Sequence, residues 1–264
     1  MPGRAYTGVS VLIRSGLALV LAAALATGCG GGAGTTSSTT SRTDATATTP
    51  RAAAFDDCLR PGPAVRLVAV PAPGERLPAV VLGRGGSTGV VFANQSASVA
   101  CGWLPYARTI ASDGVRSLVF DYAQASRDAE VLAAARWLRA HGARRVVLVG
   151  ASIGGRAVVT AAARGGPRQV DGVVSLSGER ILGAQPDLLA DARRLRVPAL
   201  WVSSENDGYT NFATETRQLY RGARGHARPD RLLVVGGDDH GIDLLTGPQA
   251  RRVVPAVTQF IRRG

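Results

Sequence analysis

The strongest constraint on the fold is an alternation between short apolar segments and segments of helical spacing, from about Ala53 to the end of the chain. The apolar segments predicted as strands are residues 65–70, 77–82, 89–93, 115–120, 145–149, 170–176, 197–202 and 232–235. The predicted helices are residues 103–112, 125–140, 153–164, 186–195, 212–221 and 249–261. Strands that alternate with helices in this way predict the α/β class, with a mostly parallel central sheet and helices on both of its faces.

Ligands of such sheets bind beyond the carboxyl ends of the strands, so the residues that follow each strand are the first candidates for chemistry. The strand at 145–149 is followed by Gly150-Ala151-Ser152-Ile153-Gly154 and then by a helix. This is the G-x-S-x-G pattern in a strand–turn–helix context, which raises a serine hydroxyl above the sheet. A second match, residues 85–89, precedes a strand and is therefore predicted to be a turn. Ser152 is the candidate nucleophile, and the backbone amide of Ile153 at the start of the helix is a candidate oxyanion donor.

A serine needs a base, and the chain has three histidines. His141 stands before a glycine at a predicted helix end, where it is expected to interact with the helix dipole. His226 lies in an Arg/Gly loop and is expected to be solvated. His240 follows the last strand, at the carboxyl edge of the sheet and after the serine in the chain, so it is the candidate base.

The third member of such a site is a carboxylate that holds the imidazole in the correct tautomer. Two acidic residues follow the strand at 197–202, namely Glu205 and Asp207. Asp207 is favoured because it stands further into the loop, and Glu205 is the alternative. Asp238 and Asp239 adjoin the histidine and are expected to shape its loop.

These residues resemble the α/β-hydrolase superfamily, in its small, dienelactone-hydrolase-like form, over about residues 64–263. The resemblance implies a catalytic triad of Ser152, Asp207 and His240. It also implies a second oxyanion donor in the loop after the third strand, which reads Ala93-Asn94-Gln95-Ser96. Asn94-Gln95 stands where the family often has His-Gly. The donor amide is placed at Ser96, with Gln95 as the alternative.

The predicted function is hydrolysis of a small carboxylic ester or lactone through an acyl-serine, without a cofactor or metal. About 20 residues separate the strands at 170–176 and 197–202, too few for a sizeable cap domain. Glu179 in this stretch is expected to cap a short helix rather than to contact substrate. Trp103 is the tryptophan expected to approach the cleft, whereas Trp137 and Trp201 are expected in the core.

Three other functions remain to be weighed against ester hydrolysis. A peptidase or thioesterase would use the same triad. A non-catalytic envelope-binding lipoprotein on the same fold would lack an activated serine. A nucleotide-binding domain is disfavoured because Ser152 occupies the position where G-x-G-x-x-G requires its second glycine.

The first 29 residues resemble a bacterial lipoprotein signal peptide. Arg4 and Arg14 bound a charged segment, an uncharged stretch rich in Leu and Ala follows, and Ala26-Thr27-Gly28-Cys29 resembles a lipobox, with Ala26 where leucine is usual. The resemblance implies lipidation of Cys29. Residues 30–52, rich in Gly, Ser and Thr, are predicted to be a flexible tether to a hydrolase domain at 53–264. The expected location is therefore the outer face of the cytoplasmic membrane.

Two further cysteines, Cys58 and Cys101, form an even pair that is predicted to be a disulfide in an oxidising compartment. The net charge of +12 comes from 31 basic residues, all of them arginine. These arginines are scattered, whereas a nucleic-acid footprint is clustered, so no nucleic-acid partner is predicted. The expected partners are a small ester substrate and the membrane that holds the anchor.

Overall fold

The computed structural model describes residues 55, 57–60, 62–95, 100–123, 126–208, 211–225 and 230–263. Several predicted features lie outside these residues, namely the signal peptide, the tether, Cys29, Ser96 and His226.

The core of the described chain is one sheet of eight strands in the order β1-β2-β4-β3-β5-β6-β7-β8. The strands are β1 (Val65–Ala72), β2 (Glu75–Leu82), β3 (Thr88–Ala93), β4 (Arg116–Phe120), β5 (Arg145–Ala151), β6 (Gly172–Leu176), β7 (Ala199–Ser204) and β8 (Arg231–Val235). β1 and β2 form a hairpin, and β2 is antiparallel to β4. Every other neighbouring pair is parallel, which confirms the predicted mostly parallel sheet.

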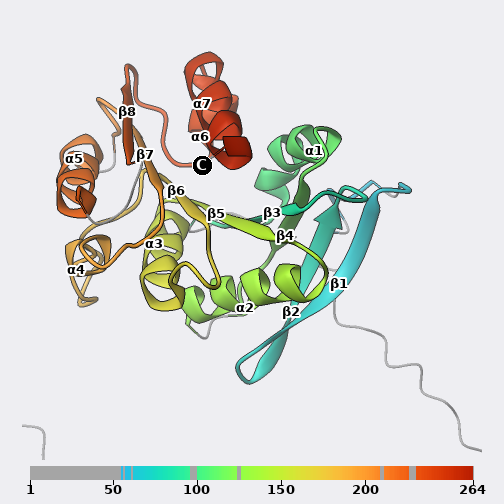
Figure 1. Ribbon diagram of the computed structural model, residues 1–264. Helices are drawn as coiled ribbons and strands as arrows, with labels where there is room; N and C mark the ends of the chain where they lie inside the picture. Colours follow the sequence, from blue (N-terminus) through green and yellow to red (C-terminus); the bar gives the residue numbers. More distant parts are fainter. Residues whose placement is uncertain are drawn as a thin grey trace, which may run out of the picture. The chain divides into compact units, whose positions relative to one another are not determined.

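Helices cover both faces of this sheet, as Figure 1 shows. They are a 3-10 turn η1 (Ala100–Trp103) and the helices α1 (Leu104–Ser112), α2 (Arg127–Ala140), α3 (Ile153–Gly165), α4 (Leu189–Ala192), α5 (Phe212–Ala223), α6 (Asp243–Thr246) and α7 (Ala250–Arg263). One apolar cluster joins a face of the sheet to α2, α3, α4 and α5. The other joins the opposite face to α1, α6 and α7.

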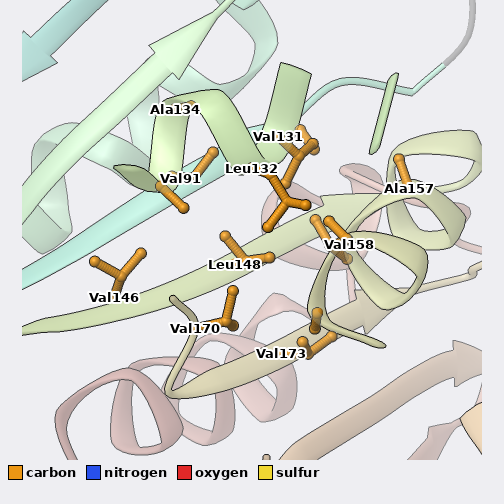
Figure 2. Packing of buried hydrophobic residues seen from close by; sticks show 14 of the residues in the cluster. Val91, Val131, Leu132, Ala134, Val146, Leu148, Ala157, Val158, Val170 and Val173 are labelled. Carbon is orange, nitrogen blue, oxygen red and sulfur yellow. The ribbon is translucent and has the colours of Figure 1, made fainter. Parts of the chain in front are cut away.

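The alternation of side chains along β5 explains the two layers. Val146 and Leu148 belong to the cluster under α2 and α3, whereas Val147 and Val149 belong to the opposite cluster. Successive side chains of a strand point to opposite faces, so a continuous apolar strand serves both layers. Figure 2 shows Leu148 facing Leu132 of α2 and Val158 of α3.

The structure shifts the bounds of several predicted elements, and two of these corrections bear on the site. The helix expected at residues 186–195 is only the single turn α4, and it begins late because Asp187 lies outside it and engages other groups. Its carboxylate accepts the backbone N–H of Leu189 at 2.8 Å and pairs with the Arg180 guanidinium at 2.6 Å. The strand expected at 197–202 begins at Ala199 and continues to Ser204, which moves the start of the following loop.

The predicted pairing of Cys58 with Cys101 is present as a disulfide with a Cα–Cα distance of 5.8 Å. It ties the segment that precedes β1 to the 3-10 turn before α1. Among the described residues, no helix has the length and apolar character needed to cross a bilayer.

Candidate active site

Ser152 lies at a sharp turn between β5 and α3, with φ 53° and ψ −121°. A non-glycine residue with this backbone conformation stores strain of about 1–3 kcal/mol and is held by its surroundings. The flanking glycines permit the turn, because a Cβ on Gly150 would lie 2.2 Å from the carbonyl oxygen of Gly154. A Cβ on Gly154 would lie 2.3 Å from the carbonyl oxygen of Ala93. The second G-x-S-x-G match, at residues 85–89, runs into β3, which begins at Thr88, so a strand and not a helix follows it, as predicted.

Asp207 and His240 are brought together from the loops that follow β7 and β8. His240 Nδ1 lies 2.8 Å from Asp207 Oδ2 and 3.0 Å from Oδ1, and the Asp207 side chain is fully buried. The ring of Phe212 packs on the imidazole with a centroid distance of 4.7 Å. Glu205, the alternative acid, instead pairs with Arg217 at 2.5 Å. The structure therefore distinguishes the two carboxylates by their partners.

The loop after β8 that carries His240, called the histidine loop below, passes beside the turn that carries Ser152. A Cβ on Gly241 would lie 3.4 Å from Cβ of Ala151, the residue before the candidate nucleophile. Asp239 holds the far side of the loop, since its carboxylate accepts the backbone N–H of Gln249 at 3.1 Å. The two segments therefore meet at the carboxyl edge of the sheet.

Ser177, at the end of β6, is a site residue that the sequence analysis missed. Its backbone has φ 47°, and its buried hydroxyl donates to Asp207 Oδ2 at 2.8 Å. Ser177 Oγ also accepts a hydrogen bond from the backbone N–H of Gly241 at 3.2 Å. Ser177 therefore links Asp207 to the loop that carries His240. No residue pattern near position 177 signals this contact.

The loop after β3 contains the polar pair Asn94-Gln95, and both side chains hold the loop in place. Asn94 Nδ2 donates to the carbonyl oxygen of Phe120 at 3.0 Å and to Asp121 Oδ1 at 3.1 Å. Gln95 Oε1 accepts the backbone N–H of Ile242 at 3.0 Å, which joins this loop to the histidine loop. Ile153 is the first residue of α3, so its backbone N–H is at a helix N-terminus.

Glu179 does not cap a helix, contrary to the expectation. Its Oε1 accepts a hydrogen bond from the Ser152 hydroxyl at 2.9 Å. The reason is the path of the chain after β6. Gly178 packs against Gly155 there, and this close approach directs Glu179 toward Ser152. A Cβ on Gly155 would lie 2.9 Å from Cα of Gly178.

A cavity of about 730 Å³ adjoins Ile153 and Glu179, and its other lining residues come from residues 182–186 and Arg127. Its size falls in the range of small-molecule sites. Trp103 does not reach it, contrary to the expectation. The indole of Trp103 is fully buried and lies 5.0 Å from the ring of Phe92, because α1 and β3 enclose it. Trp201 is buried in the core, as predicted, and Trp137 packs on the core and stacks on His141.

Neither a family model nor a curated protein matches this sequence. Solved structures match its shape. An esterase from Pyrococcus furiosus has a TM-score of 0.65 at 13% identity, covering 75% of this chain and 90% of that one. A dienelactone hydrolase from Anabaena variabilis has a TM-score of 0.61 at 21% identity, covering 75% of this chain and 96% of that one.

The chain has the α/β-hydrolase fold. The esterase domain of a Rhodothermus marinus protein is a further match, with a TM-score of 0.61 at 22% identity, covering 75% of this chain and 98% of that one. In this fold, Ser152 follows the fifth strand, Asp207 the seventh and His240 the eighth. No group of three His, Cys, Asp or Glu residues in the described part of the chain is arranged to hold a metal ion.

Proposed function

We propose that this chain is a serine hydrolase that cleaves a small carboxylic ester or lactone through an acyl-enzyme. The observation that carries the proposal is the hydrogen-bonded Asp207–His240 pair beside a strained turn that bears Ser152. The esterases and dienelactone hydrolases of the same fold support the reaction class.

In the first step, His240 Nε2 takes the proton of Ser152 as Oγ attacks the ester carbonyl carbon. Asp207 accepts Nδ1–H, which fixes the tautomer and stabilises the imidazolium that forms. The oxyanion is held by the Ile153 amide and by an amide of the loop at Gln95 or Ser96. The C–O bond to the alcohol then breaks, and His240 gives its proton to the leaving oxygen.

In the second step, water attacks the acyl-serine while His240 takes one of its protons. The tetrahedral intermediate collapses, the acid leaves, and the proton returns to Ser152 Oγ. This cycle consumes one water molecule and requires no redox partner.

The short connection between β6 and β7 supports a small substrate. It contains a single helical turn, α4, and its residues 182–186 line one side of the cavity. A domain that encloses long acyl chains requires a longer insertion here. We therefore place the substrate among short or flexible esters and lactones.

The experiment that tests the function is labelling of the purified protein with a fluorophosphonate, followed by measurement of the intact mass. The unsubstituted protein is expected to gain one phosphonyl group, and Ser152→Ala is expected to gain none. His240→Ala is expected to label at least about a hundredfold more slowly, because the base contributes roughly that factor. Ser87→Ala, in the other G-x-S-x-G segment, is the matched control and is expected to label normally.

A folded protein that does not label would contradict the proposal and favour the non-catalytic envelope-binding protein. Once labelling is established, a screen of short oxygen esters, thioesters and peptides separates esterase from thioesterase and peptidase, which share the triad.

We also propose that the protein is exported and anchored through lipidated Cys29. The lipobox-like sequence supports this, and so does the Cys58–Cys101 disulfide, because disulfides persist in oxidising compartments. Bacteria that express the chain are expected to attach an alkyne-bearing fatty acid to it, and Cys29→Ala is expected to abolish this labelling. Unchanged labelling of Cys29→Ala would contradict the anchor.

A further inference from the structure

Glu179 is the charged group that contacts the candidate nucleophile, and the role of its carboxylate is not explained by the triad. Glu179 Oε1 lies 2.9 Å from Ser152 Oγ, which donates to it. The carboxylate also lines the cavity of about 730 Å³ that begins at Ile153. It therefore stands where a substrate must approach.

The loop that carries Glu179 is held firmly by Arg156 of α3. The Arg156 guanidinium donates to the carbonyl oxygen of Arg180 at 2.8 Å, to that of Glu179 at 3.3 Å, and to that of Pro186. Its Nε donates to Gln185 Oε1 at 3.0 Å. Arg156 is itself buried, so these contacts fix the loop relative to the helix that begins at the nucleophile.

The proposed reaction removes the hydrogen-bond donor that Glu179 has in the resting protein. When Ser152 attacks, its proton moves to His240, so Glu179 Oε1 loses the donor that it has in the resting protein. A carboxylate left without a donor in a partly buried site is costly. A substrate that supplies a hydrogen-bond donor at this point would be bound more strongly in the transition state than in the ground state, which raises the rate.

The position of Glu179 indicates which part of the substrate meets it. The leaving oxygen must face His240, which protonates it, so the acyl side of the ester is left for Glu179. A carboxylate within hydrogen-bond distance of Oγ can reach a substituent on the carbon next to the scissile carbonyl. The other charged residue that lines the cavity is Arg127, whose guanidinium lies 5.7 Å from the ring centroid of Tyr122.

We propose that Glu179 determines specificity by accepting a hydrogen bond from a hydroxyl or ammonium group on the α-carbon of the acyl part of the substrate. This inference rests on the proposed function, because it names the substrate class of the same site. It also predicts that an anionic α-substituent is rejected, since two like charges would face each other.

The test uses four methyl esters of nearly equal shape: those of isobutyric acid, lactic acid and alanine, and the monoester of methylmalonic acid. They place a methyl, hydroxyl, ammonium or carboxylate group on the same carbon. Hydrolysis is followed by pH-stat near pH 7, where an α-amino group with a pKa near 7.7 is mostly charged. The kcat and KM of the unsubstituted protein and of Glu179→Gln are compared for each ester.

The ratio of kcat/KM between the unsubstituted protein and Glu179→Gln cancels the intrinsic reactivity of each ester. We expect this ratio to be at least about tenfold higher for the lactate ester or the alanine ester than for the isobutyrate ester. The difference is expected mainly in kcat. For the methylmalonate ester, Glu179→Gln is expected to raise kcat/KM. Comparison of the lactate ester with the alanine ester shows whether Glu179 prefers a hydroxyl donor or an ammonium donor.

Glu75→Gln, at the start of β2, removes the same charge from a strand that β4 and β3 separate from β5, at a residue that does not line the cavity, and is expected to change none of these ratios. Equal ratios for all four esters, with measurable turnover, would overturn the inference and leave the serine hydrolase intact. No turnover of any ester, together with no phosphonyl adduct, would instead overturn the proposed function and the inference with it.

Discussion

At the scale of single residues, the site depends on polar side chains that join loops from different strands. Ser177 contacts both Asp207 and the loop that carries His240, and Gln95 contacts that same loop at Ile242. In the proposed mechanism such contacts orient the reacting groups, so their removal is expected to cost activity without removing a reacting atom.

Ser177→Ala is predicted to lower kcat by about 10- to 100-fold, because a hydrogen bond to a charged group contributes about 1.5–3 kcal/mol. Alanine would also retain the unfavourable positive φ at this position, so Ser177→Gly is the companion variant that relieves it. Both variants are expected to lose activity in an ester assay, whereas only the glycine variant is expected to keep its thermal stability. Full activity of a folded Ser177→Gly would contradict the role.

Asp230, just before β8, is predicted to make stability depend on pH. Burial raises the pKa of its carboxyl group to about 6, against a smaller lowering by the backbone of Ala199. The folded chain therefore holds this proton more tightly than the unfolded chain does. The stabilisation by the protonated group is present near pH 4 and is lost as the pH rises to about 6.

Asp230→Asn is accordingly expected to raise the free energy of unfolding at pH 8 and to change it little near pH 4. Urea unfolding at the two values of pH measures this difference. Asp57→Asn, at an exposed position, serves as the control. An equal change in the free energy of unfolding at pH 4 and pH 8 would contradict the raised pKa of Asp230.

At the scale of elements, the site depends on how the connection after β6 is held against α3. Arg156 of α3 donates to acceptors on residues 179–186 of this connection. A planar guanidinium can donate in several directions at once, which a lysine ammonium cannot reproduce with the same geometry.

Arg156→Lys is predicted to loosen residues 179–186. We expect a clear rise in KM and only a small fall in the melting temperature. Limited digestion with trypsin reports the change, since cleavage after Arg180 is expected to become several-fold faster. Arg136→Lys, on the exposed face of α2, is the matched control. Unchanged digestion and KM would show that the loop is held by its other contacts, such as the Arg180–Asp187 pair.

At the scale of the whole molecule, the parallel strands bring three distant loops to one edge of the sheet. Asp207 follows β7 and His240 follows β8, which are neighbours in the sheet, and Ser152 follows β5. The disulfide joins the start of the described chain to the turn before α1 and makes none of the contacts of Asp207 and His240 given above, so it is expected to act on stability rather than on chemistry.

The double variant Cys58→Ser/Cys101→Ser is predicted to lose about 4 kcal/mol of unfolding free energy, because the disulfide closes a loop with a sequence separation of 43. For a domain of this size the loss lowers Tm by roughly 10 °C. Thermal unfolding with and without a reductant measures it, and kcat at 25 °C is expected to be unchanged. A reductant should have no effect on the double variant.

The sequence by itself determined the fold class, most of the strands and the identity of the strained serine turn. These features depend on short-range patterns, namely the periodicity of apolar residues and glycines where a side chain would clash. The short helix after β6 was overestimated, because the side-chain contacts of Asp187 and Arg156 replace helical hydrogen bonds there.

Only the tertiary structure decided which loops meet. It distinguished Asp207 from Glu205 by their partners, buried Trp103 away from the cavity, revealed the contacts of Ser177 and turned Glu179 toward Ser152. Each of these outcomes depends on contacts between segments that are far apart in the chain. Residue type and spacing within one segment carry no information about such contacts, because the packing of the sheet and its helices sets them.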